Sequence, residues 1–227
     1  MVNPKSSGRA GPGGRSPGSQ TLQPATEPSD QTVTERRRQV AMDGHLGGGK
    51  LARAGLADPA PAVRVTALGA LERLGELGVD DLAAGLADPD PAVRRRACEL
   101  AAGYPDLDVS SSLGDRDPSV AEMAAWALGE QGAAGAVPAL TAMAAMASGH
   151  PEPLCREAAV AALGAIGDPD GLSAVLGALE DKPAIRRRAA VALAAFAGPE
   201  VEAALRGCLE DRDWQVRQVA EDLLAVD

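Results

Sequence analysis

Aromatic, cysteine and histidine residues are all scarce in this chain of 227 residues, which holds two tryptophans, one tyrosine, one phenylalanine, three cysteines and two histidines. The cysteines show no CxxC spacing and are too few for a disulfide framework, so we expect reduced thiols. A zinc site needs three or four clustered ligands. Because His45 and His150 stand far apart in the sequence and no set of Cys, His and carboxylate residues has the spacing of a zinc site, we expect no metal site.

Long apolar runs and an excess of positive charge are missing as well. No run reaches the roughly 18–20 residues that a membrane span needs, and the first thirty residues hold no apolar signal segment. The net charge of −10 opposes general binding to nucleic acids, whose phosphates require a positive surface. We therefore expect a cytoplasmic protein without membrane or nucleic-acid partners.

Alanine, by contrast, is abundant: it accounts for 47 of the 227 residues, and it is the strongest helix former. Residues 1–30 are rich in Gly, Pro, Ser and Gln and hold few large apolar residues, which predicts a disordered tail. Residues 31–49 predict a short helix that ends in a glycine linker. The pattern that decides the fold occupies residues 50–227.

One pattern recurs six times in this region: an apolar anchor, usually followed by Arg, with Ala four positions on and another apolar residue after eight. Its first copy is Val63-Arg64, Ala67 and Leu71, and successive anchors are 27 to 35 residues apart. The anchors are Val63, Val93, Val120, Cys155, Ile185 and Val216. A period near thirty predicts a solenoid, because a single unit of this size cannot bury its apolar face alone.

Each unit is predicted to contain two helices, with the anchor pattern on the second. Spacings of four and eight residues put the apolar side chains on one helical stripe. In five of the six units proline stands two positions before the anchor, where its fixed φ suits the first helical residue. The predicted N-caps are Asp90, Asp117 and Asp213. The predicted C-caps are Gly75, Gly132, Gly167 and Gly198. The weakest helix prediction in the array covers residues 104–114. The expected fold is an all-α, right-handed α-solenoid of about six helix pairs.

Copies such as DPAPAVRVTALGALERLG and DRDWQVRQVAEDLL resemble the HEAT-repeat superfamily, in particular the short bacterial type named after phycobilin-lyase subunits. The resemblance is specific for the fold and unspecific for function. It implies a structural ladder of Asp and Arg along the array. The matching residues are Asp58, Asp88, Asp115, Asp181 and Asp211, with Arg64, Arg94, Arg156, Arg186 and Arg217. Two positions depart from it: Ala121 replaces the third Arg, and His150 replaces the fourth Asp.

Several functions stay open, because the family includes scaffolds, chaperone-like adaptors, lyases and hydroxylases. Its deoxyhypusine hydroxylases hold iron with His-Glu pairs, and this chain has no His-Glu dipeptide. No residue set identifies a catalytic centre or a cofactor pocket, which favours a protein that is not an enzyme over the enzymatic alternatives. We predict a non-catalytic scaffold or adaptor for proteins. The alternatives are a lyase- or chaperone-like protein that acts on a cofactor-bearing partner, and a HEAT-like DNA alkyl-glycosylase.

The candidate binding residues lie on one face of the second helices. At about 100° per residue, Trp126 falls opposite the buried stripe. Glu122 and Glu130 are one turn away on either side of it, and Glu99 and Glu157 come from the adjoining units. Tryptophan among carboxylates suits a basic protein or peptide partner. The competing interpretation is that Trp126 packs over the neighbouring alanine-rich helix. We expect the chain to be a monomer.

Overall fold

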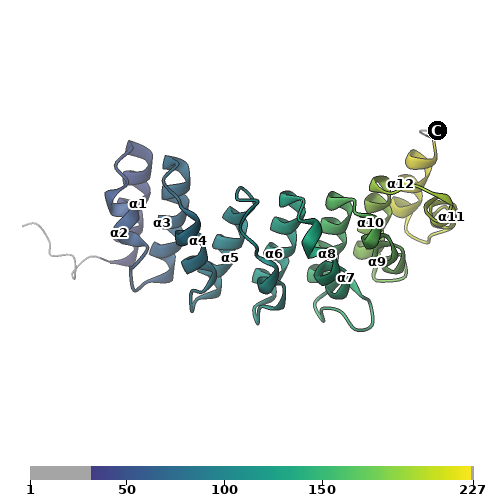
Figure 1. The fold of residues 1–227 in the computed structure, drawn as a ribbon, viewed down its shortest axis with the longest axis horizontal. Helices are drawn as coiled ribbons and strands as arrows, with labels where there is room; N and C mark the ends of the chain where they lie inside the picture. Colours follow the sequence, from purple (N-terminus) through teal and green to yellow (C-terminus); the bar gives the residue numbers. More distant parts are fainter. Residues whose placement is uncertain (1–31, 226–227) are drawn as a thin grey trace, which may run out of the picture. The chain divides into compact units, whose positions relative to one another are not determined.

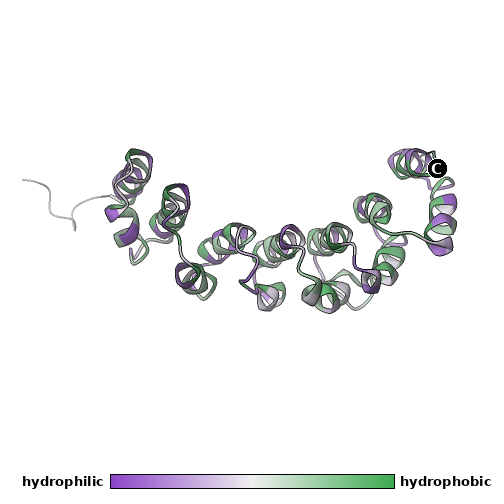
Figure 2. Cartoon of the chain, turned by 45° about the horizontal axis from the view of Figure 1, so that its top comes forward, coloured by the Kyte–Doolittle hydropathy of each residue, from purple (hydrophilic) through white to green (hydrophobic). Residues whose placement is uncertain are grey.

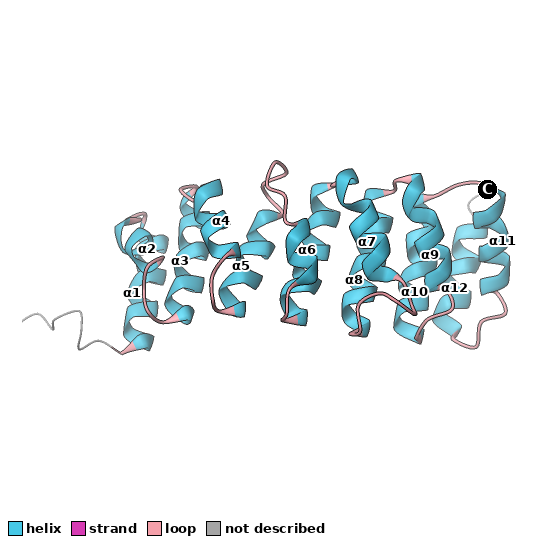
Figure 3. Ribbon diagram, turned by 60° about the horizontal axis from the view of Figure 1, so that its bottom comes forward, coloured by secondary structure: helices cyan, strands magenta, loops and turns pink. Residues whose placement is uncertain are grey.

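The computed structural model describes residues 32–225, which form twelve α-helices and contain no strand (Figure 1). The helices of this unit lie in two rows (Figures 2 and 3). Buried apolar residues from both rows form its core. The fold is an all-α, right-handed α-solenoid. The tail predicted over residues 1–30 lies outside the described residues.

The second helices of the units stack side by side in chain order. This second-helix row consists of α1 (Val33–Leu46), α3 (Pro61–Leu74), α5 (Pro91–Ala101), α6 (Pro118–Gln131), α8 (Pro153–Ile166), α10 (Pro183–Ala192) and α12 (Trp214–Leu224). The first-helix row packs against it and consists of α2 (Lys50–Gly55), α4 (Val79–Leu86), α7 (Val137–Ala144), α9 (Leu172–Ala178) and α11 (Pro199–Cys208).

The anchor pattern forms the buried stripe of the second helices. In α3, Val63, Ala67 and Leu71 are 1%, 0% and 0% exposed, and none of the six anchors exceeds 2%. Because most of the buried side chains are small, neighbouring helices approach closely. A Cβ on Gly44 of α1 would lie 2.7 Å from the Cβ of Ala70, so only glycine fits there without a shift.

The helix ends follow the predicted capping with one exception. Proline is the first residue of α3, α5, α6, α8 and α10. The side chains of the three predicted N-caps accept the backbone N–H two residues on, at 2.9–3.0 Å. Gly75, Gly132 and Gly167 end their helices with φ between 63° and 69°. The prediction for Gly198 is wrong: α10 ends at Ala192 before a 3₁₀ turn, and Gly198 is the N-cap of α11.

The array begins earlier than residue 50. Helix α1, expected as a separate short helix, packs against α2 and α3 as a member of the second-helix row. Thr32 caps its start, with its side chain and that of Glu35 each bonded to the other's backbone N–H. Gly47, with φ of 79°, ends it. The solenoid therefore has one extra helix at its N-terminal end.

The third unit lacks an α-helical first member. Residues 104–114 form a loop and a 3₁₀ helix, Ser110–Gly114. The amide of Gln131 on α6 donates to the carbonyl oxygens of Ala101, Tyr104 and Leu107 at 2.9–3.1 Å. One side chain therefore supplies hydrogen bonds that a helix would otherwise make within its own backbone.

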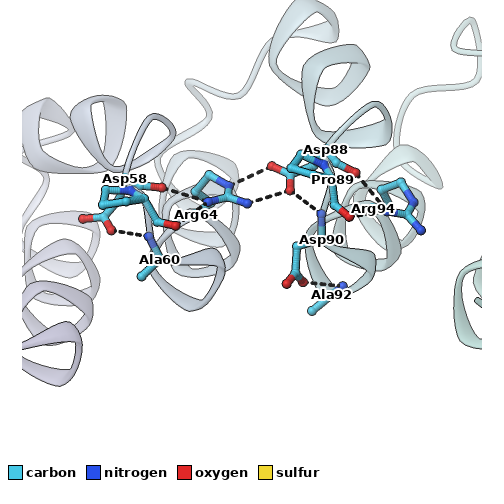
Figure 4. Close-up of polar contacts among 9 residues, drawn as sticks. Asp58, Ala60, Arg64, Asp88, Pro89, Asp90, Ala92 and Arg94 are labelled. Carbon is cyan, nitrogen blue, oxygen red and sulfur yellow. Dashed lines mark hydrogen bonds and ion pairs between the residues drawn. The ribbon is translucent and has the colours of Figure 1, made fainter.

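An Arg–Asp ladder links successive units. The guanidinium of Arg64 binds the carboxylate of the next unit, Asp88, at 2.6 and 2.7 Å. Its Nη1 also donates to the carbonyl oxygen of Asp58 in its own unit (Figure 4). A further bond joins it to the carbonyl oxygen of Pro59. The other pairs, at 2.7–2.9 Å, are Arg36–Asp58, Arg94–Asp115, Arg156–Asp181 and Arg186–Asp211. Arg64, Arg94, Arg156 and Arg186 also donate to a carbonyl oxygen of their own unit, so each of them ties the turn of one unit to the turn of the next.

Both members of one ladder pair are replaced together. Ala121 and His150 occupy the positions that would pair across the joint between the third and fourth units. His150 Nδ1 accepts the N–H of Glu152 at 3.1 Å, as ladder aspartates accept the N–H two residues on. His150 therefore keeps the turn bond without the ion pair. At the C-terminal end, Arg217 donates to the carbonyl oxygen of Asp211 at 2.7 Å.

Candidate partner-binding groove

A groove of about 620 Å³ opens on the second-helix row, where α6 stacks against α8. We call it the Trp126 groove. The residues selected from the sequence all line it: Trp126, Glu122, Glu130, Glu99 and Glu157. Three of them lie on α6 at spacings of four residues, which places them on one helical face. The stacking of α5 and α8 on either side of α6 brings Glu99 and Glu157 to the same groove.

Small residues create the space for the groove. Gly129 on α6 and Ala161, Ala162 and Ala165 on α8 line it. A Cβ on Gly129 would lie 2.9 Å from the Cα of Ala162, so the two helices approach closely at this point. The short side chains leave the volume above the contact between α6 and α8 unfilled.

Trp126 is the largest side chain in the groove. It is 43% exposed, although large aromatic side chains are usually well covered. The remaining part of the Trp126 surface is buried. An indole that is exposed to this extent offers apolar area and a π face to a ligand.

Two of the four carboxylates are already engaged. Glu99 forms an ion pair with Arg96 at 2.8 Å, and Glu157 lies 3.7 Å from the guanidinium of Arg188. Within residues 32–225, no ion pair involves Glu122 or Glu130. The groove therefore presents uncompensated negative charge one turn before and one turn after Trp126.

Two further residues, Leu154 and Arg188, line the groove but were not predicted from the sequence. Leu154 is 62% exposed on the first turn of α8. The sequence does contain a signal for Leu154. In the other four units whose second helix starts with proline, the residue between that proline and the anchor is Ala or Ser. Only Leu154 is large and apolar at that position.

Metal ligands and thiols are the other groups among the described residues that could carry chemistry. No three His, Cys, Asp or Glu side chains between residues 32 and 225 gather as a metal ion would require. Cys98, Cys155 and Cys208 are free and buried. Burial raises the pKa of each thiol, to about 11 for Cys155. Such a thiol stays protonated near neutral pH, which makes it a poor nucleophile.

The described part of the chain contains no helix that is both long enough and apolar enough to cross a membrane.

Comparison with known proteins identifies the family. The sequence pattern of HEAT repeats matches residues 79–149, 107–191 and 143–225, which together span more than half of the chain. The chain belongs to the HEAT-repeat family. No curated protein matches this HEAT-repeat chain in sequence.

Solved structures show the same architecture. An engineered protein with a TM-score of 0.63 is 18% identical, and the alignment covers 88% of this chain but only 65% of that one, just under two thirds of its length. A second engineered protein has a TM-score of 0.59 at 19% identity, over 78% and 96% of the two chains. The complex of CpcE and CpcF of phycocyanin lyase from Nostoc sp. PCC7120 has a TM-score of 0.56 at 26% identity, over 78% and 75%. The engineered proteins support the fold alone, and the lyase complex agrees with the subtype that the sequence resembles.

Proposed function

We propose that this HEAT-repeat protein is a non-catalytic scaffold or adaptor, whose Trp126 groove binds a partner-protein segment that carries arginine or lysine. The observation behind this proposal is a tryptophan with 43% exposure, in a groove of about 620 Å³ that four carboxylates line. A cation over an exposed indole contributes about 0.5–1 kcal/mol. Neighbouring carboxylates add charge pairing, which selects basic segments over neutral ones.

The unpaired carboxylates define where the partner's cation binds. Glu122 and Glu130 flank Trp126 on α6 and have no ion pair within the described residues. Glu99 and Glu157 are shared with arginines of this chain, so a ligand competes for them. We therefore place the cation over Trp126, between Glu122 and Glu130. Leu154, exposed on the opposite side of the joint, provides an apolar contact for the flanking residue.

We further propose that the protein acts as a monomer in the cytoplasm. Its three free cysteines fit a compartment that keeps thiols reduced.

Replacing Trp126 tests the proposal. The probe is a fluorescein-labelled peptide of Gly and Ser with a central Arg-Arg pair, and the measurement is anisotropy. We expect Trp126→Ala to weaken binding at least tenfold, which corresponds to about 1.4 kcal/mol, and to leave the melting temperature nearly unchanged. Trp214→Ala is the matched control, because Trp214 is 64% exposed at the start of α12, outside the groove.

Two results would contradict the proposal. In one, Trp126→Ala binds the peptide as tightly as the unmodified protein does. In the other, the substitution destabilises the fold by about 3 kcal/mol or more, the cost of truncating a core aromatic side chain. The second result would mean that Trp126 packs over α8 as a structural residue.

One observation favours a second function, lyase- or chaperone-like action on a cofactor-bearing partner. The CpcE–CpcF complex is 26% identical and aligns with 78% of this chain. If this function holds, protein purified from its native cell should bring down a coloured partner, with visible absorbance that Trp126→Ala reduces. The absence of visible absorbance in a pull-down that does recover partners would count against it.

The third hypothesis, a DNA alkyl-glycosylase, is not proposed. The four carboxylates of the groove repel the phosphates of DNA at the place where Trp126 would contact a base. Binding of alkylated duplex DNA at low salt would contradict this reasoning.

A further inference from the structure

A second hollow, of about 520 Å³, lies beside the Trp126 groove on the second-helix row and has the opposite charge. Residues of α1, α3 and α5 line it. Its basic members are His45, Arg73, Arg95 and Arg96, and its one acidic member is Glu99. We call it the basic hollow.

Two cations of the basic hollow are available to a ligand. Arg73 and Arg95 are exposed, and neither takes part in an ion pair within residues 32–225. Arg96 differs, because it pairs with Glu99 at 2.8 Å. Its Nη2 lies 2.9 Å from the point that a Cβ on Gly69 would occupy, so the guanidinium covers the backbone of α3. Gly69 thus lets Arg96 form one wall of the hollow.

The two hollows share one wall residue. Glu99 on α5 lines both of them, and α3, α5, α6 and α8 follow one another in the row (Figure 3). Neighbouring helices pack roughly 8–10 Å apart, so the joint between α3 and α5 lies about 16–20 Å from the joint between α6 and α8. An extended peptide covers this distance with about five or six residues, at roughly 3.3 Å per residue.

We infer that the basic hollow is a second subsite for the same partner segment, and that it binds carboxylate side chains. The inference rests on the proposed function of the Trp126 groove. The partner segment is then bipolar, with Arg or Lys over Trp126 and Asp or Glu about five or six residues away, beside Arg73 and Arg95. Opposite charges in adjacent subsites also fix the direction in which the segment lies across the helices, because the reversed segment places like charges together.

A peptide explains both hollows better than nucleic acid does. Phosphates suit Arg73 and Arg95, but a duplex or single strand long enough to continue past α5 would place phosphates beside Glu122 and Glu130. A peptide can change the sign of its charge within a few residues.

The test uses the full chain and three fluorescein-labelled peptides of Gly and Ser. The first carries Arg-Arg and Glu-Glu separated by five residues, the second carries the same groups in reversed order, and the third has Gln-Gln in place of Glu-Glu. The variant is Arg73→Gln with Arg95→Gln, and the control is Arg206→Gln, an exposed arginine on α11 in the other row. Circular dichroism melting checks that both variants stay folded.

We expect one of the two bipolar peptides to bind about fivefold more tightly than the Gln peptide, the gain that two exposed ion pairs supply. The double variant should remove this gain and leave the Kd of the Gln peptide unchanged. The control should change neither value. These effects should also diminish as salt is raised from 50 to 300 mM, because exposed charges are screened.

The outcomes separate this inference from the proposed function. If all three peptides bind equally and Trp126→Ala weakens all of them, the second subsite is wrong and the proposed function stands. If no peptide binds, both are wrong. Tighter binding of a 20-base-pair duplex through Arg73 and Arg95 would make the hollow a nucleic-acid site and overturn the inference. A dimer in light scattering that the bipolar peptide dissociates would identify a second copy of this chain as the occupant, which would overturn it too.

Discussion

Replacement of Arg156 by alanine removes the most deeply buried pair of the ladder. The Arg156 side chain is 8% exposed and that of Asp181 is 3% exposed. Arg156 donates to both carboxylate oxygens of Asp181, at 2.8 and 3.0 Å, and to the carbonyl oxygens of His150 and Pro151 at 2.8 and 3.2 Å. After the substitution, the Asp181 carboxylate still accepts a hydrogen bond from the backbone N–H of Lys182, at 2.7 Å. A buried charge is left with one hydrogen bond.

The expected loss follows from this geometry. Removing one partner of a buried ion pair costs about 3–5 kcal/mol, because the remaining charge is uncompensated. For a domain of this size, each kcal/mol lowers the melting temperature by about 2–4 °C. We therefore expect Arg156→Ala to lower it by about 6–20 °C. Arg156→Ala combined with Asp181→Ala should lose less than the sum of the two single changes, since the double variant leaves no unpaired charge.

Urea unfolding with two matched controls provides the measurement. Arg217 occupies the same position of its helix but, within residues 32–225, bonds only the carbonyl oxygen of Asp211, so Arg217→Ala should cost about 0.5–1.5 kcal/mol. Arg206 pairs with Glu202 at the surface of α11, so Arg206→Ala should cost about 0.3–0.5 kcal/mol. Equal losses for Arg156→Ala and Arg206→Ala would refute the view that the ladder stabilises the array.

Three further predictions concern acid stability, the replaced ladder pair and the N-terminal segment. The Arg156 guanidinium holds the pKa of Asp181 below its usual 3.8. The pair's contribution to the free energy of unfolding is therefore complete above about pH 4 and is lost as the pH falls through the folded-state pKa. Asp181→Asn should be less stable than the unmodified protein at pH 7, and its stability in urea titrations should fall less steeply below pH 4. Ala121→Arg with His150→Asp should restore a ladder pair. The double variant should therefore be about 1 kcal/mol more stable in urea than the sum of the stability changes of the two single variants. Strict additivity of these changes would mean that no pair forms. A chain that begins at Thr32 should melt within about 5 °C of the full chain, because residues 1–30 have no apolar periodicity, and a larger drop in calorimetry would show that they pack on the array.

Local sequence was sufficient for most of the helices and their ends, with Gly198 and residues 104–114 as the exceptions. Spacings of four and eight residues place side chains on one stripe of any α-helix, so Val63, Ala67 and Leu71 could be predicted as core without knowledge of their neighbours. Proline and aspartate at the first turn act on the backbone within two or three residues. The same angular argument placed Trp126 opposite the buried stripe, where the structure shows it 43% exposed.

Helix α1 shows where the repeat pattern stops being informative. The ladder pair Arg36–Asp58 aligns Arg36 with Arg64, so Glu35, Gln39 and Asp43 of α1 correspond to the core stripe of α3. This stripe packs against a first helix in the complete units, and no first helix precedes α1 among the described residues. Polar residues are therefore tolerated there, and the anchor pattern that marks the other units is missing. Packing of α1 on α3, which only the tertiary structure shows, makes it part of the array.

The tertiary structure alone decided the pairing of the ladder and the shape of the binding face. The sequence identified the arginines and aspartates, but the distance from Arg64 to Asp88 depends on how one unit stacks on the next. The volume of the Trp126 groove depends on the close approach of α6 and α8 at Gly129 and Ala162. Its nearness to the basic hollow depends on α5, which contributes Glu99 to the walls of both. Such features combine residues from several units, and the relative position of units is set by packing between helices that are distant in the sequence.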